Sequence, residues 1–190
     1  MVFLYLLLGH FLSDFVFQPT KLMTWKHKSW KGVIFHAFVH FAVYLLIIFP
    51  LLRNFTAVLV LLIIAATHFL IDSIKINVEK KNKHFMMLFF LDQIIHITIL
   101  GIGYAYINSL SLKLFTDFYP GPYVSVYIIL GIILTYCVEI VQFQGLRKQQ
   151  PHAGFKPDFH KMLKRLAIFS FFYVIFAVRS IYEIARTVHP

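Results

Sequence analysis

The sequence predicts an all-α membrane protein, a polytopic bundle of about six transmembrane helices. Of its 190 residues, 59% are hydrophobic and 14% are charged, whereas a soluble domain is usually about 45–50% apolar and about 25% charged. The apolar residues fall into blocks of about twenty, the length that crosses a hydrocarbon core about 30 Å thick. Lysines and arginines gather between these blocks. Together these observations favour a membrane bundle.

Six apolar blocks are candidates for spans. The first block lacks the basic start and the small-residue cleavage site of a signal peptide, so we expect a retained helix. Prolines lie at or near several block ends, where they interrupt helices most readily. Arg179 and Glu183 lie near the end of the last block, where they can reach the interface. The predicted spans cover residues 2–17, 32–52, 55–74, 85–107, 122–144 and 166–186.

Basic residues divide unequally between the two ends of these spans. Fourteen of the 18 Lys and Arg residues lie in segments 18–31, 75–84 and 145–165, which share one side. By the positive-inside rule that side is cytoplasmic, and both termini face out. The net charge of +10 is therefore typical of loops that orient helices and meet anionic lipid, not of nucleic-acid binding. Membrane lipid is the expected partner, and the oligomeric state stays open.

Four of the spans each carry two ionisable side chains in apolar sequence. The pairs are His10/Asp14, His36/His40, His68/Asp72 and Asp92/His96. Residues four apart share a helix face, so both side chains of a pair can reach one cation. In the predicted orientation all four pairs lie toward the cytoplasmic side, although lysines and arginines alone set that orientation. The pattern predicts one shared site.

Metal ligation is the favoured interpretation of the pairs, with interhelical hydrogen bonds and a proton relay as the alternatives. A buried Asp needs a partner. Hydrogen bonds between helices, however, require only one polar residue per helix, not two on one helix face. Five His and three Asp exceed the ligands of one four-coordinate ion and suit two divalent ions with open positions. This donor set favours Zn, with Fe or Mn as alternatives, and the single Cys137 excludes a cysteine cluster.

The pairs also suggest an internal duplication and a division of the chain. His10 and His36 begin the pairs of the first unit, and His68 and Asp92 begin those of the second, at similar separations. Such units would be parallel repeats about an axis along the membrane normal. We expect residues 1–107 to form a four-helix metal-site core. Residues 108–190 would add two transmembrane helices and a basic cytoplasmic loop.

Three carboxylates are candidate catalytic groups. Asp14 or Asp72, if not fully committed to metal, would act as a general base. Glu139 lies at the inner end of the fifth span, where it is a candidate ligand, a base or an ion-pair partner of Arg165. Weaker candidates beside the pairs are Gln18, Ser73 and Gln93. The histidines expected to lie in solvated loops are His27, His84, His152 and His160.

The sequence also resembles known families. The segment "LLLGHFLSDFVFQPTKLMTWK", followed by "FHAFVH", "THFLIDSIK" and "LDQIIHI", resembles the bacterial membrane family called domain of unknown function 3307, over about residues 1–107. More weakly, "HFLIDS" is similar to an element of the YdjM-like inner-membrane proteins, described as metal-dependent hydrolases, although their P-D-x-D segment is absent here. These resemblances imply a protein of the bacterial inner membrane.

A membrane-embedded metal-dependent hydrolase is the expected function, acting on a lipid or membrane-associated ester or phosphoester from the cytoplasmic leaflet. A di-iron membrane oxidoreductase is one alternative, but only His36/His40 matches the histidine boxes of that class. A divalent-cation transporter is another, although such sites usually use helices broken by Gly or Pro near the midplane. A purely structural metal site is the third.

Overall fold

The computed structural model describes residues 1–82, 84–110, 121–147 and 155–188, with side chains described up to residue 180. These parts of the chain are helical and contain no strand. The helices are α1 (Val2–Phe11), η1 (Leu12–Val16), α2 (Thr20–Lys28), α3 (Trp30–Ile47), η2 (Phe49–Arg53), α4 (Phe55–Lys81), α5 (Phe85–Ser109), α6 (Pro122–Ile132), η4 (Ile133–Cys137), α7 (Val138–Arg147) and α8 (Phe159–Val188).

Four helical segments are long and apolar enough to cross a membrane. They are α3, α4, α5 and the continuous helix Pro122–Arg147, built from α6, η4 and α7. The bent pair Val2–Val16 and Thr20–Lys28 brings the number to five if it counts as one span. The all-α fold with several candidate membrane-spanning helices is therefore confirmed. The sixth predicted span, 166–186, falls in α8, part of which lies outside the described side chains, and it stays a prediction.

The first span differs from the straight helix predicted over residues 2–17. After α1 the chain widens into the π-helix η1, where the Phe17 N–H donates to the Leu12 carbonyl at 2.8 Å. The ten residues of α1 and five of η1 extend only about 22 Å, less than a bilayer core. Pro19, with φ of −63°, cannot continue the hydrogen-bond ladder. The chain therefore turns by 87° into α2.

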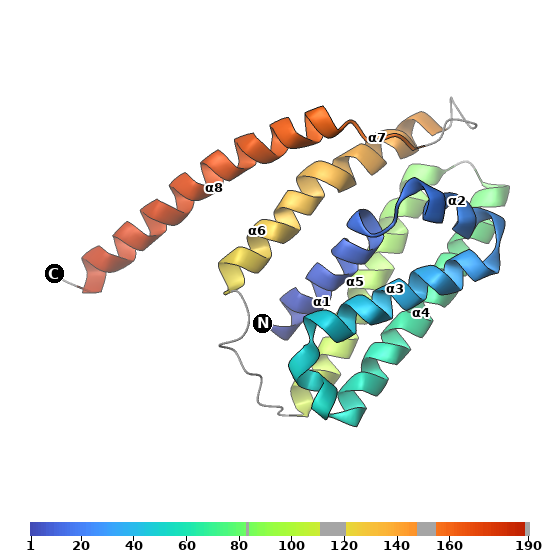
Figure 1. Ribbon diagram of the computed structural model, residues 1–190, viewed down its shortest axis with the longest axis horizontal. Helices are drawn as coiled ribbons and strands as arrows, with labels where there is room; N and C mark the ends of the chain where they lie inside the picture. The colour runs from blue at the N-terminus through green and yellow to red at the C-terminus, as the bar shows by residue number, and fades with distance from the viewer. Residues whose placement is uncertain (83, 111–120, 148–154, 189–190) are drawn as a thin grey trace.

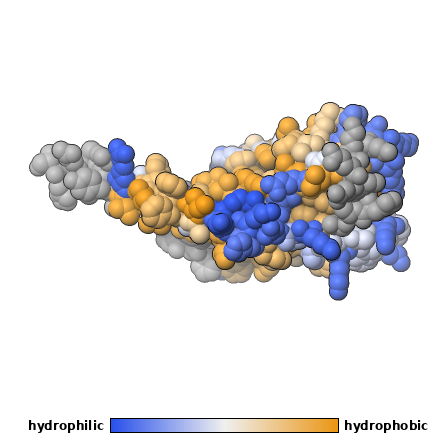
Figure 2. Space-filling model, turned by 90° about the horizontal axis from the view of Figure 1, so that it is seen from above, coloured by the Kyte–Doolittle hydropathy of each residue, from blue (hydrophilic) through white to orange (hydrophobic). Residues whose placement is uncertain are grey.

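α2 corrects a second expectation, because residues 18–31 are mainly a helix and not a basic loop. Figure 1 shows α1, α3, α4 and α5 packed together, with α2 at one end of them and with α6 and α8 on the outer side of α1. The start of α3, the end of α4 and the start of α5 lie at that same end, as does the end of α7. Each of the three predicted basic segments therefore begins or ends at this same end of the bundle. Figure 2 shows hydrophilic residues at that end and in a second group midway along the visible face, with hydrophobic residues over much of the rest.

Two apolar clusters pack α1 between its neighbours. The first includes Tyr5, Leu6, Tyr44, Leu61 and Leu100, and it joins α1 to α3, α4 and α5 near the amino end of α1. The second joins the other face of α1 and η1 to α6 and α7. Its members include Leu8, Phe11, Phe15, Ile129 and Ile140. One side of α1 is thereby left for polar residues that meet α3, α4 and α5.

Gly32 allows α2 to lie directly against the first turns of α3. A Cβ atom at Gly32 would lie 2.6 Å from the Trp25 carbonyl carbon and 2.7 Å from the Lys26 nitrogen. Both are backbone atoms, so no side-chain rotation relieves the contact. The position of α2, and of every side chain it carries, therefore depends on this glycine.

We predict that Gly32→Ala lowers the melting temperature in detergent, at a cost of about 1–3 kcal/mol, because overpacking displaces backbone. Gly101→Ala is the matched control, since a Cβ atom there would meet no neighbouring segment within 4 Å and alanine favours helix by up to about 1 kcal/mol. Equal melting temperatures for the two variants would contradict the role assigned to Gly32.

Candidate metal centre

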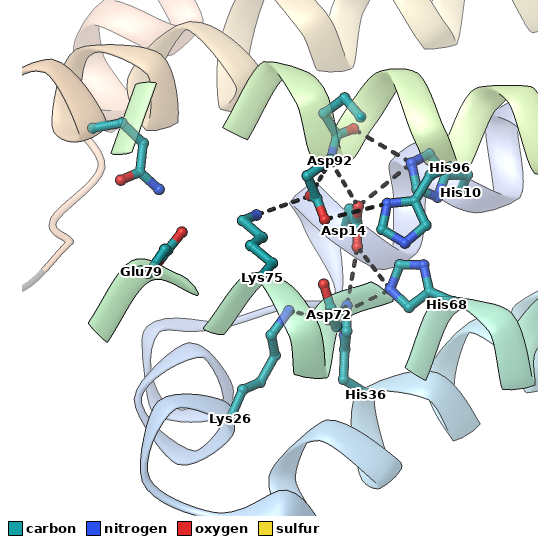
Figure 3. Close-up of polar contacts among 12 residues, drawn as sticks. His10, Asp14, Lys26, His36, His68, Asp72, Lys75, Glu79, Asp92 and His96 are labelled. Atoms are coloured by element: carbon teal, nitrogen blue, oxygen red, sulfur yellow. Dashed lines mark hydrogen bonds and ion pairs between the residues drawn. The ribbon is translucent and has the colours of Figure 1, made fainter. Parts of the chain in front are cut away.

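All eight ionisable residues of the four pairs meet in one buried cluster. Each is less than 9% exposed, and His36 and His40 are fully buried. α1 and η1 contribute the first pair, and α3, α4 and α5 contribute the others. Figure 3 shows carboxylates and imidazoles from these helices pointing toward one another. The spacing-based prediction that four helices share one site is matched by the geometry, while metal binding itself stays a prediction.

Asp14 lies at the centre of the cluster. Its Oδ1 atom is 3.0 Å from Nε2 of both His36 and His40, and 3.6 Å from Nε2 of His68. Its Oδ2 atom is 3.4 Å from His10 Nε2. One carboxylate thus faces imidazoles from three helices, a set that can gather around a cation as well as around a proton.

The π-helix and two glutamines hold Asp14 in this position. η1 inserts extra width into the turn that carries Asp14, and such π-turns often occur at functional sites. Gln93 Nε2 donates to Asp14 Oδ2 at 3.2 Å, and Gln93 Oε1 lies 3.3 Å from His10 Nε2. With its amide oriented to suit its neighbours, Gln18 donates to the Asp14 carbonyl at 3.0 Å and accepts from Lys26 Nζ at 3.2 Å. The two glutamines predicted as neighbours therefore do contact the site.

Asp72 and Asp92 each bind a lysine. Lys26 Nζ donates to Asp72 Oδ2 at 2.6 Å, and Lys75 Nζ donates to Asp92 Oδ2 at 2.8 Å. Lys26 is nearly as buried as the carboxylate it contacts. Removing one partner of such a pair leaves an uncompensated buried charge, which typically costs about 3–5 kcal/mol.

Three overlapping sets of side chains have ligand atoms close enough for one ion each. In every set the ligand atoms lie within 4.8 Å of one another. The sets are His10, Asp14, His40 and His68; His36, His68 and Asp72; and Asp72, Asp92 and His96. Because His68 and Asp72 are shared, neighbouring ions would lie close together, as in dinuclear sites.

Several ring nitrogens in the cluster have no hydrogen-bond partner among the described residues. They include both nitrogens of His96, Nε2 of His68 and Nδ1 of His36 and His40. Asp92 Oδ1 is in the same condition. Unpaired buried polar atoms typically cost about 1–3 kcal/mol each, so a native site normally satisfies them. His68 and His96 both belong to the ligand sets above, and imidazole and carboxylate donors of this kind fit divalent metal ions.

A cavity of about 220 Å³ opens beside the cluster. Asp14, Asp72 and Asp92 line it, while the five clustered histidines do not. The carboxylates therefore separate the imidazoles from the cavity. Lys26, Lys75, Glu79 and Arg147 form the rest of its charged lining.

Glu139 lies outside this arrangement, so the structure does not bring this candidate catalytic carboxylate to the cluster. Its carboxylate accepts from the Asp158 N–H at 3.0 Å and from the Arg165 guanidinium. It does not line the cavity. Among the three alternatives for Glu139, the contacts match the ion pair, which fastens α8 to α7. Ser73 likewise donates to its own helix, at the Phe69 carbonyl.

The other histidines take different positions. His84 and His160 are exposed, as expected, and His152 lies outside the described residues. His27 is only partly exposed, with its Nε2 atom 4.0 Å from Glu79 Oε2. The expectation of a solvated loop is therefore wrong for His27, because α2 folds it against the cavity that it lines.

Four charged residues beside the cluster are not predicted from the spacing of the pairs. Three of them are among the basic residues that predict the membrane orientation. Lys75 and Glu79 follow Asp72 by three and seven residues, so they continue the His68/Asp72 stripe of α4. That spacing was a usable signal. Lys26 and Arg147 have no such spacing, because they reach the cluster only through the packing of α2 and α7. Arg147 Nη1 lies 3.0 Å from Glu79 Oε2, and Arg147 Cζ lies 4.3 Å from the Phe85 ring centroid.

A family model matches the amino-terminal part of the chain. No curated protein and no solved structure matches the chain. The model of the family described as "Protein of unknown function (DUF3307)" matches residues 2–122, which include all eight clustered residues. That match spans more than half of the 190 residues. The chain belongs to the DUF3307 family.

Proposed function

We propose that the protein is a membrane-embedded, metal-dependent hydrolase that acts on a lipid or on another membrane-associated ester or phosphoester. The observation that carries this proposal is the order of the groups: three carboxylates line a cavity, and histidines with unpaired ring nitrogens lie directly behind them. A substrate in the cavity would contact the carboxylate side of the cluster. The weaker YdjM-like resemblance points in the same direction.

Two divalent transition-metal ions, most suitably Zn, with Fe or Mn as alternatives, would fit the ligand sets. His10, Asp14, His40 and His68 supply four donors, which is enough to close a tetrahedral site. Asp72, Asp92 and His96 supply three, the number that leaves a position open in catalytic sites. The set of Asp72, Asp92 and His96 includes two of the carboxylates that line the cavity. We assign substrate contact to this three-residue set and a supporting role to the four-residue set.

When bound, such ions supply Lewis acidity toward a water molecule and an ester oxygen. The protein's own groups supply positioning and proton transfer. Asp72 and Asp14 present carboxylate oxygens toward the cavity, where either can accept a proton from an attacking water. Lys26 orients the Asp72 carboxylate, and Gln93 orients that of Asp14.

The hydrolytic proposal is favoured over the three alternatives by the cavity and by the donor set. A structural site is coordinatively closed, whereas the set of Asp72, Asp92 and His96 has three ligands beside a cavity. The three Asp residues make the cluster richer in carboxylate than a histidine box. Of the four contributing segments the first is interrupted, at η1 and Pro19, whereas α3, α4 and α5 run unbroken past the cluster, unlike the paired interrupted helices of many transporters.

We also propose that the protein lies in a bacterial inner membrane with both termini outside. Support comes from the basic segments that begin or end at one end of the bundle (Figure 1). In this orientation α2 and the cavity face the cytoplasmic leaflet. Trp25 and Trp30, both exposed on or beside α2, are typical of an interfacial helix.

We expect the purified protein to bind about two transition-metal ions per chain. His40→Ala and His68→Ala should lower that content, because each removes a buried donor of the four-residue set. His84→Ala is the control, since His84 is exposed and lies outside the ligand sets. Elemental analysis after reconstitution measures this, and protein that takes up no Zn, Fe or Mn would refute the proposal.

Replacing single carboxylates distinguishes catalysis from a structural metal. Asp14→Asn and Asp72→Asn should lower hydrolysis by about 10²–10⁴-fold, the usual contribution of a general base, with most of the folded protein retained. Asp72→Asn also strands Lys26, so the double variant Lys26→Gln/Asp72→Asn separates loss of the ion pair from loss of the carboxylate. Glu139→Gln should lower stability and leave metal content unchanged. The alternative outcome is that the Asp variants show mainly a lower melting temperature. The free energy of metal binding would then contribute chiefly to folding, and the site would be structural.

The orientation is tested with single cysteines in a Cys137→Ser background. A membrane-impermeant maleimide should label Arg53→Cys in intact cells, because η2 lies at the end of the bundle away from α2 (Figure 1). Lys81→Cys, at the end of α4, should react only after lysis. The reverse pattern would overturn the cytoplasmic placement of the cavity.

A further inference from the structure

The cavity beside the cluster combines three cations with an apolar wall. Lys26, Lys75 and Arg147 come from α2, α4 and α7, and all three side chains line it. They are at most about one-fifth exposed, so each charge is held in a largely dehydrated environment. Buried cations in a cavity are normally matched by a specific anion.

Each of the three cations is paired with a carboxylate. Lys26 contacts Asp72, Lys75 contacts Asp92, and Arg147 contacts Glu79. Two of these carboxylates belong to a candidate ligand set, whereas Glu79 belongs to none. Metal ions bound by Asp72 and Asp92 would compete with the lysines for the same oxygens. The ammonium groups would then be available to another anion.

The charge balance of the lining depends on the metal ions. The carboxylates of Asp14, Asp72, Glu79 and Asp92 exceed the three cations by one negative charge. Two divalent ions would change that balance to three positive charges. The lining is thus suited to a multiply charged anion only when metal is bound.

The remaining lining combines uncharged polar residues with an apolar wall. The apolar wall includes Phe15, Met23, Phe89, Ile140, Phe143 and Phe155, from η1, α2, α5, α7 and the chain before α8. A free phosphate ion would gain little from such a wall. The volume of about 220 Å³ equals the space of roughly seven water molecules, which suffices for a phosphate and a few carbon atoms.

We propose that this cavity binds the phosphate group of an amphiphilic phosphate monoester, held by Lys26, Lys75 and Arg147 with its carbon chain along the apolar wall. The inference rests on the proposed function, because bound metal sets the sign of the charge, and it selects phosphoesters over carboxylic esters as the substrate class. Arg147 supplies a planar guanidinium that can hold two phosphate oxygens at once.

Binding to the full-length protein in a phosphate-free detergent tests the proposal, with Zn content measured on the same sample. Titration calorimetry would compare a single-chain lipid phosphate, inorganic phosphate and the neutral lipid without phosphate. We expect the lipid phosphate to bind at least roughly tenfold tighter than either other probe, and only after Zn loading. Equal binding of the neutral lipid, or of inorganic phosphate, would overturn the proposal.

Variants outside the ligand sets sharpen this test. Arg147→Gln should weaken binding of the lipid phosphate roughly tenfold or more, since hydrogen bonds to charged groups are among the strongest. Glu79→Gln should tighten it, because this change removes the carboxylate that competes for Arg147. A purely structural Glu79–Arg147 pair would give lower stability in both variants and no opposite shifts in affinity. Lys161→Gln, at an exposed position, should change nothing.

The outcomes separate this inference from the proposed function. Protein that binds no metal refutes the proposed function itself. Metal-loaded protein that binds no lipid phosphate overturns only the inference about the cavity. Hydrolysis of a carboxylic ester without phosphate binding would do the same and would leave the metal-dependent hydrolase standing.

Discussion

The carboxylate of Asp14 lies buried between four helices, and the cost of burying that charge shapes the surrounding bundle. On insertion scales an Asp at the centre of a transmembrane helix costs about 2.5–3.5 kcal/mol. Asp14 therefore requires partners, and His10, His36 and His40 supply imidazole nitrogens within 3.4 Å. The helices that carry these partners must approach closely, so this one group constrains how α1 and η1 pack against α3.

Apolar packing closes the bundle at the end of α1 away from the polar cluster. The cluster of Tyr5, Tyr44, Leu61 and Leu100 fills the space between α1, α3, α4 and α5. A second cluster, on the other face of α1, holds α6 and α7. The cavity lies on the side where α2 and α7 border it, so the cavity, its charges and the candidate ligands all lie at one end of the molecule.

Several features of the site could be predicted because they depend on local pattern. Four pairs at one spacing each place two side chains on one helix face, and a buried charge must face a neighbour and not lipid. All eight residues consequently meet. Glu139 shows the limit of that logic: its depth matched the site, but depth along a helix says nothing about rotation. Its carboxylate turns toward Arg165 and the Asp158 amide instead.

By itself, the sequence determined the membrane bundle, the places of its principal spans and the eight residues of the cluster, because hydropathy and helical periodicity are local properties. Only the tertiary structure decided the π-turn at Asp14, the 87° turn into α2 and the approach of Lys26 and Arg147. These features arise from contacts between segments far apart in the chain. Gly32 is an example. A Cβ atom at this position would collide with the backbone of α2, and this is evident only once α2 is placed against α3.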